Sequence, residues 1–257
     1  MASQVRYGAR TGASQPAPAS VDIWATAVTA VWETDPDVIA AVLPPPLEPS
    51  DEPLTRLTIS IVDIPGMPTF GAGWFGVRAR HGDVEGEYPL FMPMTSEQSV
   101  IGGREAYGEP KKMADIWVRR DGDTIEAGIA RMGYTVCEIH GSVTETREPY
   151  EKTKRDFWFK IAAGAEVRSQ PDQDALLVYG EKTEAARVHE GIDGEVKLPE
   201  APLDPIADLA IRRLVDLNWT ERTSTQVGRV VATVPAATIT PWLHQRYDDL
   251  TALGANT

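Results

Sequence analysis

The sequence predicts an α+β protein built mainly from antiparallel β-strands. Short stretches in which apolar and polar residues alternate recur along the chain, as expected for strands with one buried face. Hairpin-type turns separate several of them, at His81-Gly82-Asp83 and at Asp121-Gly122-Asp123. Helical spacing of apolar residues occurs in only a few segments. These observations favour a large antiparallel sheet or barrel with a few peripheral helices.

The first half of the chain is predicted to hold four strands and two helices. Thr34-Asp35-Pro36 gives a capping side chain followed by proline, which is typical of a helix start, and Pro44-Pro45-Pro46 ends that helix. Thr95-Ser96-Glu97 is a second capping sequence, from which a short helix is expected toward Tyr107. The strands are expected at residues 21–32, 54–64, 74–80 and 87–94.

The second half is predicted to continue the sheet and to end in helices. Ile206, Leu209 and Leu214 stand at helical spacing and predict a helix over residues 206–217. The expected strands are 116–119, 124–132, 134–146, 156–162, 174–190 and 226–234, and a last helix is expected over about 239–252. No interior linker or repeat divides the chain, so residues 21–257 are expected to form a single domain. Residues 1–20 are rich in Ala, Ser, Gly and Pro and are expected to form a flexible N-terminal arm.

Composition narrows the classes of function. The formal net charge of -13 argues against a nucleic-acid surface and against docking on anionic lipid. No stretch approaches the ~18 apolar residues of a membrane helix, and no apolar signal core stands at the N-terminus. The single cysteine, Cys137, excludes an intrachain disulfide and favours a reducing compartment. A cytoplasmic protein that acts on a small molecule, without nucleic-acid or membrane partners, is expected.

The familiar cofactor and metal motifs are not found in the sequence. None of the four histidines stands at metal-ligand spacing to another histidine or to the cysteine. The chain has neither a phosphate-binding loop nor a Gly-x-Ser-x-Gly elbow. We therefore expect chemistry that uses neither a metal nor a cofactor.

The segment from Gly102 to Met113 carries the strongest chemical signal, because Pro110 precedes the adjacent lysines Lys111 and Lys112. Two ammonium groups that share a low-dielectric pocket repel each other, which lowers a lysine pKa. An amine that is neutral near pH 7 can attack a ketone or aldehyde and form an imine. On a regular strand the two side chains would point to opposite faces. A shared pocket therefore requires an irregular backbone, which Pro110 makes possible.

Gly103-Arg104-Glu105, a short spacer and Pro110-Lys111-Lys112 together resemble the signature of the acetoacetate decarboxylase family. That enzyme is a standard example of a lysine activated by a neighbouring cation. The resemblance covers roughly residues 21–245, and the chain looks like a divergent member of the family. Weaker matches lie at residues 33–35, 43–47, 51–56, 86–88, 132–134, 188–190 and 201–203.

The resemblance implies a conical β-barrel with an apolar cavity and a homo-oligomeric state. It implies Lys111 as the Schiff-base lysine and Lys112 as the neighbour that lowers its pKa. Arg104 and Glu105 belong to the motif, and we interpret them as a charge pair that braces the helix behind the lysines.

The chain departs from the family in the polar groups expected around the lysine. The two family glutamates fall on Thr58 and Ala72, and the family arginine falls near Ala25. Thr58 and Ala72, with Tyr107, are candidate pocket residues. Glu109 stands where the family usually has an aromatic residue, and it is either a displaced acid/base or a solvated glutamate.

Three hypotheses follow. The first is a lyase that decarboxylates a keto acid bulkier than acetoacetate through a Lys111 imine. The second is an aldolase-dehydratase that uses the same lysine on pyruvate and an aldehyde, with Glu109 and Tyr107 moving protons. The third is a non-catalytic protein of the same fold that binds a small molecule.

Overall fold

The computed structural model describes residues 23–167 and 170–253. Within them the strands are β1 (Ile23–Glu33), β2 (Glu48–Pro49), β3 (Leu54–Asp63), β4 (Phe70–His81), β5 (Val84–Met94), β6 (Lys111–Met113), β7 (Asp115–Asp121), β8 (Thr124–Arg131), β9 (Tyr134–Thr146), β10 (Tyr150–Lys160), β11 (Ala175–Lys197) and β12 (Arg213–Val234). The α-helices are α1 (Pro36–Val42), α2 (Glu97–Tyr107) and α3 (Ala236–Ile239), and the 3-10 helices are η1 (Ile206–Asp208), η2 (Thr240–Arg246) and η3 (Leu250–Leu253). The N-terminal arm predicted for residues 1–20 lies outside the described residues.

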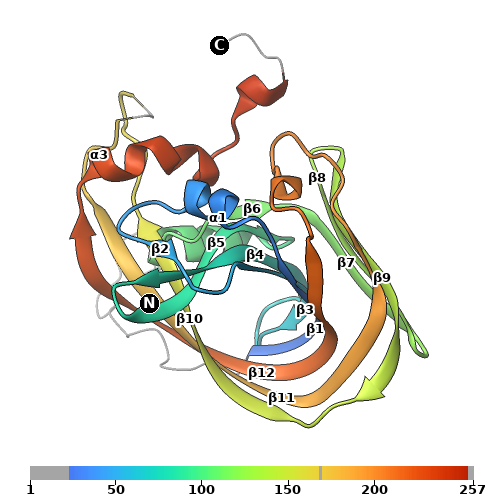
Figure 1. Ribbon diagram of the computed structural model, residues 1–257. Coiled ribbons are helices and arrows are strands. Elements are labelled where there is room, and N and C mark those ends of the chain that lie inside the picture. Colours follow the sequence, from blue (N-terminus) through green and yellow to red (C-terminus); the bar gives the residue numbers. More distant parts are fainter. Residues whose placement is uncertain (1–22, 168–169, 254–257) are drawn as a thin grey trace, which may run out of the picture.

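The strands form one sheet that closes into a barrel (Figure 1). The hydrogen-bonded order is β10-β5-β4-β3-β1-β12-β11, and β11 pairs back with β10 to complete the ring. β11 is long enough that its second half leaves the ring and pairs with β9, which β8 and β7 follow. Most pairings are antiparallel, while β10 and β6 each pair with β5 in parallel. The predicted fold class, α+β with a mainly antiparallel barrel, is confirmed.

Local sequence signals explain the two longer helices. The Asp35 side chain caps α1 by accepting a hydrogen bond from the Asp37 amide, and Pro36 occupies the first turn. The Ser96 hydroxyl caps α2. Gly108 ends α2 at φ 78°, a left-handed conformation that favours glycine. Both helices begin where the capping sequences predict.

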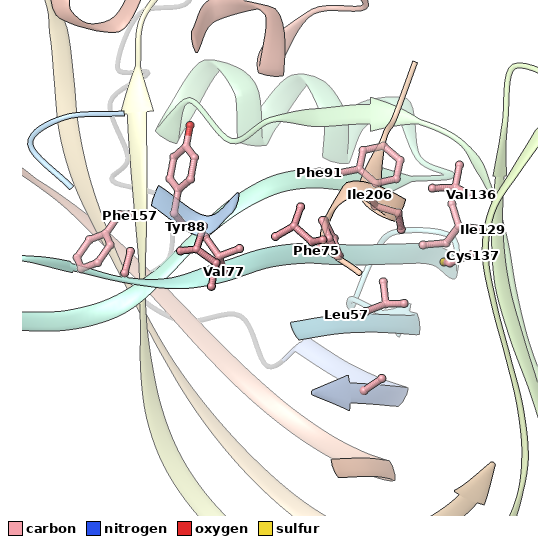
Figure 2. Close-up of a cluster of buried hydrophobic side chains, with 14 of the residues drawn as sticks. Leu57, Phe75, Val77, Tyr88, Phe91, Ile129, Val136, Cys137, Phe157 and Ile206 are labelled. Carbon is pink, nitrogen blue, oxygen red and sulfur yellow. The ribbon is translucent and has the colours of Figure 1, made fainter. Parts of the chain in front are cut away.

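Alternation along the strands separates a packed outer face from a polar interior. On β3, Leu57 and Ile59 are fully buried in the main hydrophobic core, whereas Thr58 and Ser60 line a cavity inside the barrel. Cys137 lies in the same core, and burial raises the pKa of its thiol. Figure 2 shows Leu57 and Phe75 from the barrel gathered with Ile129 and Cys137 from the outer strands β8 and β9.

The helix predicted over residues 206–217 is wrong. A 3-10 helix covers only Ile206–Asp208, and β12 begins at Arg213. Strand pairing overrides the helical spacing, because Arg213 already pairs with Glu33 of β1. The expected C-terminal helix is likewise replaced by short α3 and the 3-10 helices η2 and η3. In the described part of the chain, no helix is long and apolar enough to cross a membrane.

Candidate active site

Lys111 reaches the barrel cavity from β6, a short parallel strand on β5. Lys111 is opposite Met92 in the register of the two strands, and the Met92 amide donates to the Pro110 carbonyl at 3.2 Å. The Lys111 amide donates to the Glu109 carbonyl at 2.8 Å, so the chain turns tightly around Pro110 before the strand begins. The Lys111 side chain is only 14% exposed and lines the cavity.

Glu109 forms an ion pair with Lys111 inside the barrel. Its Oε2 lies 2.8 Å from the Lys111 Nζ, and its Oε1 accepts a hydrogen bond from Gln226 Nε2 at 3.2 Å. Glu109 is 2% exposed, so it is not the solvated glutamate of the second interpretation. A carboxylate this close to the amine can accept a proton from it and return one.

Gly103 allows α2 to lie directly over this pair. A Cβ at Gly103 would stand 2.6 Å from the Lys111 Nζ and in still closer contact with the Glu109 Oε2. Gly102, its neighbour on the same helix, would meet nothing within 4 Å. The glycine of the Gly-Arg-Glu motif is therefore a packing requirement of the lysine site.

Gly103→Ala is expected to slow imine formation by about 10- to 100-fold, because its methyl group displaces the Lys111–Glu109 pair by a fraction of an ångström or more. The measurement is the rate of borohydride-trapped adduct formation with a keto acid. Gly102→Ala is the matched control and should keep the wild-type rate. Equal rates for the two variants would contradict the packing role of Gly103.

Lys112 does not share the cavity with Lys111, and the predicted shared pocket is wrong. Its Nζ lies 2.9 Å from Asp204 Oδ1 and 3.1 Å from Asp248 Oδ1. Arg131 also pairs with both carboxylates. The physical reason is strand alternation, because β6 is regular from Lys111 onward and sends successive side chains to opposite faces. Lys112 therefore fastens β6 to the C-terminal segment.

The charge pair predicted between Arg104 and Glu105 is also wrong. Arg104 Nη1 donates to the Lys111 carbonyl at 3.0 Å and to the Arg246 carbonyl at 3.1 Å. Glu105 is exposed, and none of the ion pairs found among residues 23–167 and 170–253 joins it to Arg104. The two are consecutive on α2 and point in different directions. Arg104 supports the site through the Lys111 backbone, without Glu105.

The cavity beside Lys111 has a volume of about 390 Å³ and one apolar region. Tyr107, Thr58 and Ala72 line it, as the sequence predicts. The Tyr107 ring packs on Trp158 with centroids 5.3 Å apart. The apolar lining also includes Ile23, Ala25, Val62, Ile64, Phe70, Trp74, Met92 and Met94. This region can hold a carbon skeleton next to the amine.

Sequence reasoning missed the charged residues that line the rest of the cavity. They come from β3, β10, β11 and β12 and are Arg56, Lys154, Asp156, Lys182, Glu184 and Arg222. Glu184 is 1% exposed and lies 3.0 Å from Lys154, 3.3 Å from Arg222 and 3.4 Å from Lys182. Burial opposes its ionisation, but these cations outweigh burial and hold the Glu184 pKa well below its usual value.

A family model for acetoacetate decarboxylase (ADC) matches residues 5–234. The chain belongs to the acetoacetate decarboxylase family. It is 29% identical to the CLA biosynthesis isomerase of Lactiplantibacillus plantarum over 53% of this chain and 50% of that protein. The chain thus spans about half the length of that curated relative.

Solved structures of acetoacetate decarboxylase-like proteins share the fold. Acetoacetate decarboxylase from Legionella pneumophila matches with a TM-score of 0.74 and 22% identity over 86% of this chain and 93% of that one. The enduracididine biosynthesis enzyme MppR, complexed with the condensation product of pyruvate and imidazole 4-carboxaldehyde, matches with a TM-score of 0.71 and 15% identity over 83% and 90%. The barrel is therefore that of the acetoacetate decarboxylase family.

In this member of the acetoacetate decarboxylase family, Thr58 and Ala72 stand at the positions where the family glutamates are expected, and they make different contacts. Thr58 accepts a hydrogen bond from Arg56 at 3.1 Å and contacts the Thr29 hydroxyl at 3.1 Å. Arg56 also forms a two-pronged pair with Glu87, at 2.6 Å for the closest contact, and lies 3.5 Å over the Trp74 ring. Ala72 supplies only a methyl group to the cavity.

Alternating polar residues in the sequence mark these charged positions, but the same pattern fits either a solvent-exposed strand face or the lining of a cavity. Lys154 and Asp156 are alternate residues of β10, and Lys182 and Glu184 are alternate residues of β11. Alternating polar residues usually indicate a solvent-exposed strand face. Only closure of the barrel turns that face into the lining of a cavity.

Asp156→Asn is expected to raise the free energy of unfolding more at pH 8 than at pH 5, by on the order of 2 kcal/mol. Burial, only partly offset by Arg56, raises the Asp156 pKa to about 7. A raised pKa stabilises the fold fully below the unfolded-state pKa, and this stabilisation is lost as the pH rises through 7. Urea unfolding of both proteins at the two pH values measures the difference. A variant effect that is equal at pH 5 and pH 8 would show that Asp156 does not titrate in this range.

Among residues 23–167 and 170–253, no group of His, Cys, Asp and Glu side chains could hold a metal ion.

Proposed function

We propose that this protein is a Schiff-base lyase that decarboxylates a keto acid through an imine on Lys111. The observation that carries the proposal is the Lys111 amine, which lines the barrel cavity with the buried Glu109 carboxylate 2.8 Å away. Membership in the acetoacetate decarboxylase family supports the same chemistry. The cavity, about 390 Å³, has room for a substrate larger than acetoacetate.

In the proposed reaction the Lys111 amine attacks the ketone carbon, and the resulting carbinolamine loses water to give a protonated imine. Glu109 first takes a proton from the paired Lys111 ammonium, so that the neutral amine can attack, and gives this proton to the carbonyl oxygen. It then carries one of the two remaining nitrogen protons to the hydroxyl, which leaves as water. When the carboxylate is on the carbon next to the imine carbon, as in a 3-keto acid, the imine nitrogen accepts the electron pair of the breaking carbon–carboxylate bond, and carbon dioxide leaves. Protonation of the enamine carbon and hydrolysis of the imine release the product and restore Lys111.

The apolar side of the cavity favours loss of the carboxylate. Val62, Phe70, Met92 and Met94 offer no hydrogen bond to an anion. An ionised carboxylate held against such side chains is costly, and neutral carbon dioxide is not. Tyr107 lines the same cavity and is a candidate to move the proton to the enamine carbon.

Carbon dioxide release from 3-keto acids of increasing size tests this function. The proposal expects release that depends on Lys111 and is faster for acids with longer chains than for acetoacetate. If no 3-keto acid releases carbon dioxide above the uncatalysed rate, decarboxylation is excluded.

A second candidate is an aldolase-dehydratase that uses the same lysine. It is supported by Glu109 and Tyr107, two proton-carrying groups that line the cavity with Lys111. Incubation with pyruvate and an aldehyde distinguishes the candidates, because a conjugated condensation product absorbs in the near ultraviolet and no carbon dioxide forms. The predicted cytoplasmic location and homo-oligomeric state remain predictions.

A further inference from the structure

The proposed imine chemistry leaves a group of buried charges unused in the cavity. We call Lys154, Asp156, Lys182, Glu184 and Arg222 the charged cluster. Asp156 is 7% exposed, Glu184 1% and Arg222 4%, so these three are largely withdrawn from bulk water, while Lys154 and Lys182 are half-buried. Charged groups withdrawn from water are costly unless they are paired.

The charged cluster carries more positive than negative charge. Lys154, Lys182 and Arg222 all direct their charge at the one carboxylate of Glu184. The neighbouring Arg56 does not need the cluster's carboxylates, because Glu87 pairs with it in two-pronged fashion. Three cations on one carboxylate leave two positive charges in excess, or one when Asp156 is ionised, as long as Lys154 is protonated. Burial and Arg56 lower the Lys154 pKa to about 7, as expected for an ammonium group with too little counter-charge.

Polar atoms of the charged cluster also lack hydrogen-bond partners. Asp156 Oδ1 is buried without a hydrogen bond, and Arg222 Nε has no hydrogen bond beyond its 3.3 Å ion-pair contact with Glu184 Oε1. Buried polar atoms are nearly always hydrogen-bonded in folded proteins, so these atoms point to a missing group. A carboxylate would accept from Arg222 and from protonated Asp156 together.

The distance between the charged cluster and Lys111 fits a substrate with a short carbon chain. Arg222, Ser224 and Gln226 are alternate residues of β12 that line the cavity, and Gln226 contacts Glu109. Arg222 and Gln226 are four residue steps apart along the strand, or roughly 13 Å of backbone. The Arg222 and Lys111 side chains shorten this separation, which leaves room for a short chain of carbon atoms.

We propose that the charged cluster binds a second carboxylate of the substrate, so that the substrate class is a keto acid with a distal carboxylate. That the substrate carries a keto group rests on the proposed function, whereas the carboxylate subsite does not. Lys182, Lys154 and Arg222 supply the positive charge that holds the distal end. The reacting end then lies against the apolar wall beside Lys111.

Glutarate, a dicarboxylate without a ketone, tests the subsite separately from the imine. Calorimetric titration of the full chain should show glutarate binding at least 10-fold tighter than butyrate. Lys111→Ala should keep this preference. Lys182→Met should weaken glutarate binding by at least 10-fold, while Lys160→Met, an exposed lysine on β10, should not change it.

The outcomes separate the two proposals. Wild-type protein that binds glutarate no better than butyrate overturns the subsite, as does a Lys182→Met variant that binds it as tightly as wild type. If Lys182→Met does not fold by circular dichroism, Lys154→Met takes its place with the same expected loss. Glutarate binding that depends on Lys182, with no trapped imine, supports the subsite and overturns the proposed lyase. A borohydride-trapped adduct that saturates at lower 2-oxoglutarate than 2-oxobutyrate supports the subsite and the Lys111 imine.

Discussion

Lys111→Ala is expected to abolish trapped imine and to lower carbon dioxide release by at least about 10³-fold, as removal of a catalytic nucleophile does. The reason is geometric, because Lys111 is the lysine that contacts Glu109 within the cavity. Turnover of a 3-keto acid and intact mass after borohydride reduction measure the two effects. Circular dichroism checks that the variant is folded.

The neighbouring lysine provides the matched control. Lys112→Met should still form the adduct, because the Lys112 Nζ contacts Asp204 and Asp248 and does not line the cavity. This variant should instead lose stability, since it leaves two partly buried carboxylates with only Arg131 as a partner. If Lys112→Met stays folded but forms no adduct, Lys112 takes a direct part in imine formation by Lys111.

Glu109→Gln has the second largest expected effect, a fall in kcat/KM of about 10²- to 10⁴-fold. Glutamine has the shape of glutamate and can still accept from Gln226, but it cannot take the proton of the attacking amine. The measurement is steady-state decarboxylation together with the rate of adduct formation.

Glu105→Gln is the control for Glu109→Gln. Glu105 belongs to the same motif but is exposed, so its replacement should leave both rates unchanged. A Glu109→Gln variant with wild-type rates would remove Glu109 from the mechanism and leave it a structural partner of Lys111.

The sequence predicts the parts of the fold that depend on local chemistry. The cap at Asp35, the cap at Ser96 and the hairpin turn at Gly122 all lie where predicted. The position of the lysine site is also predictable, because its motif is continuous in the sequence. Proline at residue 110 and glycine at residue 103 both act on the backbone or packing next to Lys111.

The predictions that proved wrong concern contacts between segments that are distant in the sequence. Residues 213–217 have helical spacing but pair with β1, and this pairing is not visible in a single segment. Lys112 finds its partners 92 and 136 residues further along the chain, at Asp204 and Asp248. Glu184 and its three cations become a cluster only when β10, β11 and β12 close the barrel.

The most direct test of the account is the mass of the protein after borohydride reduction with 2-oxoglutarate, followed by mapping of the modified residue. The account predicts one adduct for each chain, on Lys111, absent from Lys111→Ala and retained in Lys112→Met. An adduct on another lysine, or no adduct in a protein that releases carbon dioxide from a 3-keto acid, would contradict the central claim that Lys111 forms the imine.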